Sequence, residues 1–116
     1  MEQVLSPEIA LARAADTLTL RLRGVVGIMG AAELYDAAVA LTEHTGAVAI
    51  DATAVEHFDC SAAQILLALR GALGEGGRTA PLIGPAEGAR GYLALAGLAE
   101  PLGLADLPRT PDPVRP

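Results

Sequence analysis

Three adjacent residues with ionisable or nucleophilic side chains, Asp59, Cys60 and Ser61, follow an apolar run and precede a helical pattern. A strand that turns into a helix at this point places small polar side chains at the positive end of the helix dipole, where negative charge is favoured. We therefore expect the function of the chain to be located at this turn.

Other chemistry at these residue types is less well supported by the sequence. A thiol at a helix N-terminus can be reactive, but Asp59 beside Cys60 opposes thiolate formation and no Lys or Arg neighbours it. His44 and His57 fall at expected element boundaries, and one Cys with two His does not readily supply a structural zinc site. We expect no metal site.

Enzymatic motifs are also missing from the sequence. Ser61 is not in a Gly-x-Ser-x-Gly elbow, and the chain has neither a phosphate-binding loop nor a dinucleotide fingerprint. The sequence predicts a protein that is not an enzyme and needs no cofactor.

Length and composition indicate one small acidic domain. The chain has 116 residues, of which 52% are apolar and only 3% aromatic, so the core must consist of Ala, Leu, Val and Ile. A net charge of -6 argues against nucleic acid and against a basic membrane-surface helix. The single cysteine excludes an internal disulfide, and no secretory signal or membrane-spanning run is recognised, so we expect a cytoplasmic protein.

The first half of the chain predicts a hairpin followed by a helix. Apolar and polar residues alternate over Ile9–Ala14 and Thr17–Arg23, which is typical of paired strands. Leu18, Leu20 and Leu22 would share the buried face. The glycine-punctuated segment from Gly24 to Gly30 is interpreted as a loop before a helix over 31–44.

The second half predicts alternating strands and helices. A buried strand over 48–55 would end at a Glu56-His57 turn, and Ser61-Ala62-Ala63-Gln64 fits a capping box that starts a helix. A short strand is expected over 79–83 and a helix over 87–96. The predicted fold is α/β, with a mixed four- to five-stranded sheet backed by three to four helices in one domain (1–106). A proline-rich tail (107–116) would follow it.

The turn and its flanking elements resemble a known family. The run DATAVEHFDCSAAQILLALRGAL, followed by a glycine-rich stop, a short strand and a helix ending in LALAGL, is similar to the STAS domain of bacterial anti-sigma factor antagonists. In that family, the residue after the Asp of the turn is a Ser or Thr that a partner kinase phosphorylates.

The resemblance makes Cys60 the phosphoacceptor-equivalent position, where a thiol cannot serve as an ordinary kinase acceptor. Ser61 is then either a displaced phosphosite or the helix cap. The family also tends to carry an acidic residue in the loop that corresponds to Gly24–Gly27, and this sequence has none there. These departures indicate a phosphorylation switch that is degenerate or lost, with a partner-binding surface retained at Asp59, Cys60, Ser61, Ala62 and Gln64.

The resemblance therefore implies a non-enzymatic regulatory module for signal transduction and transcription regulation, whose partner would be a kinase-like anti-sigma factor. Two alternatives remain open. The chain could be the STAS subunit of a phospholipid-transporting ABC complex, bound to its ATPase, or a STAS partner in a chemotaxis or stress-signalling assembly.

Overall fold

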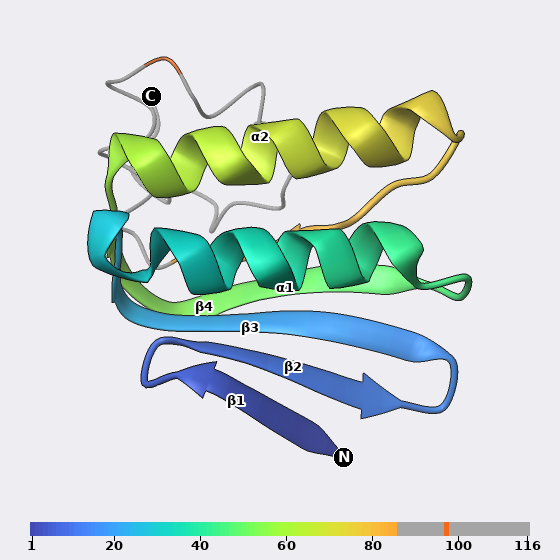
Figure 1. The fold of residues 1–116 in the computed structure, drawn as a ribbon, viewed down its shortest axis with the longest axis horizontal. Helices are drawn as coiled ribbons and strands as arrows, with labels where there is room; N and C mark the ends of the chain where they lie inside the picture. The colour runs from blue at the N-terminus through green and yellow to red at the C-terminus, as the bar shows by residue number, and fades with distance from the viewer. Residues whose placement is uncertain (86–96, 98–116) are drawn as a thin grey trace, which may run out of the picture.

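The computed structural model describes residues 1–85 and residue 97, which form a mixed sheet with two helices (Figure 1). The strands are β1 (Glu2–Ser6), β2 (Ile9–Ala14), β3 (Thr17–Val26), β4 (Val48–Phe58) and β5 (Leu82–Ile83). A short 3-10 helix, η1 (Ile28–Gly30), leads into α1 (Ala31–Glu43), and α2 (Cys60–Glu75) follows β4. No described helix is both long and apolar enough to cross a membrane.

The sheet follows the order of the chain, β1-β2-β3-β4-β5. The first three strands pair antiparallel, whereas β3, β4 and β5 pair parallel. Parallel neighbours require a crossover, which α1 provides between β3 and β4. As a result, β3 and β4 both end at the same edge of the sheet and each leads into a helix there (Figure 1).

Alternation along the central strands separates a buried face from an exposed one. Leu18, Leu20 and Leu22 are buried in β3, while Arg21 and Arg23 are exposed between and after them. The helices α1 and α2 run side by side in the same direction, and their buried residues join those of the strands in a single core (Figure 1). Leucine and alanine provide the helical part of that core: Leu34, Ala37, Ala38, Leu41, Ala62, Ala63, Leu66, Leu69 and Leu73.

The predicted α/β class, the hairpin and the two central helices are confirmed, and several boundaries are wrong. The structure adds β1, which the sequence analysis did not predict. Strand β3 continues through Val26, into the expected loop. Strand β5 is confined to Leu82–Ile83. The described residues contain two α-helices; the helix predicted over 87–96 and the tail over 107–116 lie outside them.

The turn predicted at Glu56-His57 is also wrong, because β4 continues to Phe58. The pairing with β3 shifts once between Arg21 and Arg23 and again after Gly24: Gly24 is opposite Val55 and Val25 is opposite His57, which leaves Glu56 as an extra residue in β4. An extra residue of this kind is a β-bulge, and it interrupts the alternation by which a strand is recognised in a sequence. Beyond the bulge, Phe58 returns to the core and is fully buried.

Candidate functional site

The candidate site lies where β3 and β4 end together. Val26 pairs with Phe58 in the last register of the two strands, and the Asp59 N–H donates to the Val26 carbonyl (3.0 Å). This bond holds the start of α2 next to the segment that enters η1. Residues 27–30 and 59–62, far apart in the sequence, therefore form one turn region.

The Asp59 carboxylate connects the two halves of this region. Its Oδ1 accepts hydrogen bonds from the Ala62 N–H (3.1 Å) and the Ser61 hydroxyl (2.6 Å), and its Oδ2 accepts one from the Ile28 N–H (2.9 Å). Gly27 allows this approach, because a Cβ built on it would overlap the Asp59 carboxylate. One side chain thus caps α2 and fixes the entry to η1.

These hydrogen bonds favour the ionised form of the carboxyl group. The Ser61 hydroxyl is the main cause that lowers the pKa of Asp59, and partial burial opposes it. The N–H groups of Ala62 and Ile28 lower the pKa of Asp59 further. The site therefore carries a fixed negative charge at neutral pH.

The helix cap is Asp59, so the prediction that Ser61 could cap α2 is wrong. Asp59 has extended backbone angles (φ -95°, ψ 178°), and α2 begins immediately afterwards at Cys60. Ser61 already lies in the first turn, half-buried, where its hydroxyl donates to Asp59 instead of accepting from the helix. A carboxylate is an equally good cap, and here it lies two residues earlier than the capping-box pattern indicated. A phosphate on Ser61 would lie against the Asp59 carboxylate.

The other predicted surface residues separate into exposed and buried ones. Cys60 and Gln64 are exposed and one helical turn apart, so they lie on the same side of α2. Ala62 is fully buried in the core, which corrects its assignment to the partner-binding surface. A helix that packs one face against the sheet cannot expose four successive positions.

Apolar side chains next to the turn were not recognised in the sequence. Val25, Ile28 and Met29 are 64%, 71% and 95% exposed. They line a shallow groove of about 320 Å³ together with Glu8 and Asp59. The signal was present in the run Val25-Val26-Gly27-Ile28-Met29, which is unusually apolar for a loop.

The two histidines are not brought together at this site. His44 is the C-terminal boundary of α1, and its Nε2 lies 2.7 Å from the Asp16 carbonyl at the opposite end of the molecule. His57 lies within β4, one residue before its end. His44 and Ser61 therefore lie at opposite ends of the described structure.

The fold and the turn define the chain as a STAS domain. The model of the family described as "Mlab, STAS domain" matches residues 9–107, and the chain belongs to that family. The predicted resemblance is confirmed. No curated protein sequence matches the chain.

Solved structures show the same fold at low sequence identity. A candidate anti-sigma factor antagonist from Thermotoga maritima is 15% identical over 78% of this chain and 79% of its own, with a TM-score of 0.66. The anti-sigma factor antagonist SpoIIAA in its unphosphorylated form is 13% identical over 75% of this chain and 82% of its own, with a TM-score of 0.61. Part of the protein Mglu, 19% of its chain, matches 66% of this one with 23% identity and a TM-score of 0.56.

Proposed function

We propose that this chain is a non-enzymatic, cytoplasmic regulatory module that binds a protein partner in the manner of an anti-sigma factor antagonist. Membership of the STAS family supports this proposal, as does the likeness to two such antagonists in fold. The single observation that carries it is the exposed N-terminal turn of α2, where Cys60 and Gln64 face outward beside a carboxylate held by three hydrogen bonds.

In this proposal the partner would be a kinase-like anti-sigma factor, and binding would not be switched at position 60. A phosphate adds about -1.5 to -2 charges to an interface, and that repulsion can dissociate a fitted complex. Cys60 offers no hydroxyl for an ordinary kinase, so binding is constitutive or is controlled through the partner. Ser61 as an alternative phosphosite would have to give up its bond to Asp59.

The first experiment is affinity capture of the tagged chain from its native cells, with mass spectrometric identification of what binds. A kinase-fold anti-sigma factor among the captured proteins would support the proposal. Capture of an ABC-type ATPase with membrane partners would instead favour the role as a subunit of a phospholipid-transporting complex. Capture of a chemotaxis or stress-signalling protein would favour a role in that kind of assembly.

The purified partner then allows a test of the surface itself. Cys60→Glu places a negative charge where a phosphate would be, and we expect it to weaken binding at least tenfold. Thr45→Glu, also exposed but beyond the far end of α1, is the matched control and should bind normally. Equal affinity of both variants would show that the N-terminus of α2 is not the contact.

Cys60→Ser tests whether only the acceptor has changed. If the captured partner has kinase activity, we expect it to phosphorylate the new hydroxyl at position 60 and to bind the modified protein more weakly. If the Cys60→Ser variant is not phosphorylated and binds unchanged, the kinase regulation of this position is absent as well as the acceptor.

A further inference from the structure

The exposed apolar side chains beside the turn form a patch at one end of the molecule. Val25 is the penultimate residue of β3, next to the bulge at Glu56, and Ile28 and Met29 form the outer part of η1. Their exposed fractions of 64%, 71% and 95% are high for large apolar side chains grouped within five residues. A group of this kind indicates a contact with another molecule more often than isolated exposed residues do.

The backbone beneath the patch is held in place. The Ile28 N–H is bound by Asp59 Oδ2, and the Gly30 N–H donates to the Gly27 carbonyl (3.0 Å). The exposed side chains therefore stand on a fixed turn and are not carried by a loose loop. A pre-organised apolar surface loses less entropy when a partner covers it.

The surroundings of the patch are acidic. Glu8 and Asp59 line the same groove as Ile28 and Met29, and Glu56 is the bulged residue beside Val25. The nearest cation along β3 is Arg23, which is exposed two residues before Val25. The three carboxylates around the patch therefore outnumber the positive charge.

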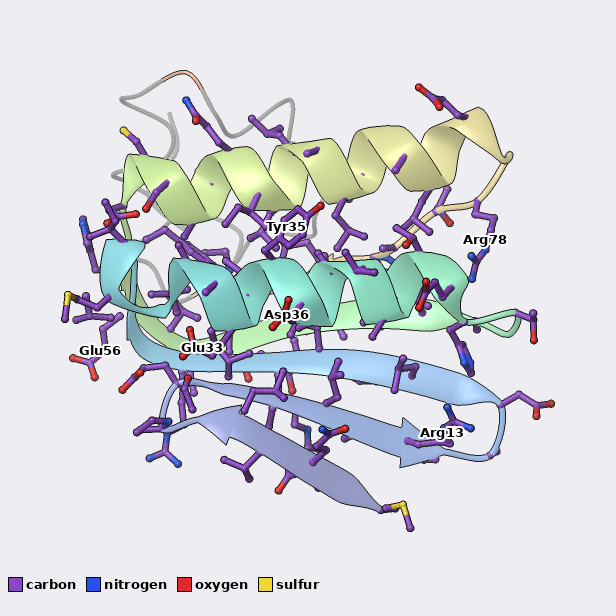
Figure 2. All side chains as sticks on the ribbon, in the orientation of Figure 1. Arg13, Glu33, Tyr35, Asp36, Glu56 and Arg78 are labelled. Carbon is purple, nitrogen blue, oxygen red and sulfur yellow. The ribbon has the colours of Figure 1, made fainter. Side chains whose placement is uncertain are left out.

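The charge pattern continues along α1. This helix carries Glu33, Asp36 and Glu43 and no basic residue, and no Lys or Arg occurs between Arg23 and Arg70. In Figure 2, Glu33 and Asp36 lie along one side of α1, and Glu56 lies at the end of the molecule where η1 begins. Arg13 and Arg78 lie at the opposite end (Figure 2).

We propose that the Val25, Ile28 and Met29 patch is a docking site for a protein segment that presents apolar side chains flanked by arginine or lysine. The inference rests on the proposed protein-binding function and specifies the chemistry of the partner. The carboxylates would repel nucleic acid and anionic lipid surfaces, whereas they complement a basic protein segment. Apolar contact supplies affinity, and the charged rim supplies selectivity and speed of association.

The patch can be probed without knowing the natural partner. One synthetic amphipathic peptide carries leucines on one face flanked by arginines, and a second peptide replaces every arginine by glutamate. Both are titrated into the full chain labelled at its Met, Ile and Val methyl groups, and binding is followed by NMR. We expect the arginine peptide to shift the methyl signals of Met29, Ile28 and Val25 and to bind about tenfold more tightly than the glutamate peptide.

Salt and substitutions sharpen the test. Raising ionic strength to about 1 M, where the Debye length is about 3 Å, should weaken the arginine peptide several-fold. Val25→Asp should weaken it about tenfold, as expected for losing a buried Val contact. Val4→Asp is the matched control, because Val4 is a strand valine with nearly the same exposure (66%) on the edge strand β1. Met29→Ser provides a second variant at an almost fully exposed position and should weaken binding several-fold.

The proposal is overturned if the glutamate peptide binds as tightly, if salt has no effect, or if the shifted methyl groups are those of Met1 and Val4. These outcomes do not depend on the capture experiment. If capture identifies no regulatory protein but the arginine peptide binds as expected, the proposed function fails and the docking surface stands. If capture identifies a regulatory partner whose affinity is unchanged by Val25→Asp and Met29→Ser, the proposed function stands and the patch is not where that partner binds.

Discussion

The end of the molecule where the parallel strands finish and the end where the helices finish are stabilised by opposite kinds of side chain. At the first end, the Asp59 carboxylate accepts from the N–H groups of Ala62 and Ile28. At the second, the Arg78 guanidinium donates to the carbonyls of Thr42 (3.4 Å) and Gly46 (2.7 Å). The His44 ring must also act as a donor there, because its partner is the Asp16 carbonyl.

For the Ala62 N–H in α2 and the Thr42 carbonyl in α1, this difference follows from the polarity of the helix backbone, whereas the Gly46 and Asp16 carbonyls lie in turns outside the helices. The N-terminal turn of a helix has N–H groups without partners and the C-terminal turn has carbonyls without partners. An anion satisfies the first and a cation the second. The Asp59 end also combines its fixed carboxylate with the exposed apolar side chains of Val25, Ile28 and Met29.

The largest effect is expected where two backbones touch at the Arg78 end. A Cβ on Gly46 would overlap the Asp16 carbonyl oxygen and lie 2.9 Å from His44 Nε2. Because backbone atoms cannot rotate away, we expect Gly46→Ala to lower the free energy of unfolding by about 3 kcal/mol. Urea denaturation measures this value. Gly71→Ala, where a Cβ meets open space, should instead be neutral or stabilise α2 by up to about 1 kcal/mol. Equal stability of the two variants would contradict the contact.

At the Asp59 end, a Cβ added to Gly27 would meet a side chain, the Asp59 carboxylate, and not backbone atoms. The effects of substitutions at Gly27 and Asp59 should therefore depend on each other. Asp59→Ala removes the cap and the bond to Ile28, and we expect a loss of about 2 kcal/mol. Gly27→Ala should displace the same carboxylate and cause a similar loss. If both act through this group, the double variant loses clearly less than the sum of the single variants. Strict additivity in a double-mutant cycle would show that Gly27 acts independently of Asp59.

A smaller effect is expected for the guanidinium at the other end. Arg78→Ala removes the donor to the Thr42 and Gly46 carbonyls, and we expect a loss of about 1 kcal/mol in the free energy of unfolding. The control is Arg21→Ala, since Arg21 pairs with Glu2 only at the exposed surface (3.6 Å) and should contribute about 0.5 kcal/mol or less. A loss at Arg21 as large as that at Arg78 would argue against a specific contribution of the hydrogen bonds to Thr42 and Gly46.

Local patterns in the sequence were sufficient for the parts of the fold that depend on neighbouring residues. The alternation in Thr17–Arg23 correctly predicted the buried leucines of β3, and the apolar spacing over 31–44 correctly predicted α1. The resemblance around Asp59 indicated the family. The bulge at Glu56 was not predictable, because the register of β4 depends on β3, a strand that lies more than twenty residues earlier.

The sequence analysis placed the candidate site at Asp59, Cys60 and Ser61, and it did not predict the hydrogen bonds made there. A capping-box pattern at Ser61 favoured the wrong cap, since the carboxylate at position 59 competes for the same helix N–H groups. The bond between Ile28 and Asp59 joins residues 31 positions apart, and no periodicity reports it. The apolar patch was overlooked for the same reason: its residues are informative only once their exposure is known.

The smallest expected effect concerns the pH dependence of stability. It is compared among the natural chain, a variant of Asp59 and a variant of Ser61, whose hydroxyl donates to Asp59. Because the folded-state pKa of Asp59 is lowered from its ordinary value of 3.8, the ionised carboxylate contributes stability above that value. This contribution is lost as the pH falls below about 4 and through the lowered pKa. The difference in unfolding free energy between the natural chain and Asp59→Asn should therefore narrow over that acidic range.

Since Ser61 is the main cause of the lowered pKa of Asp59, the stability of Ser61→Ala should show a weaker pH dependence than that of the natural chain. Chemical denaturation at a series of pH values measures all three slopes, and parallel curves for the natural chain and Asp59→Asn would mean that the charge of Asp59 does not stabilise the turn.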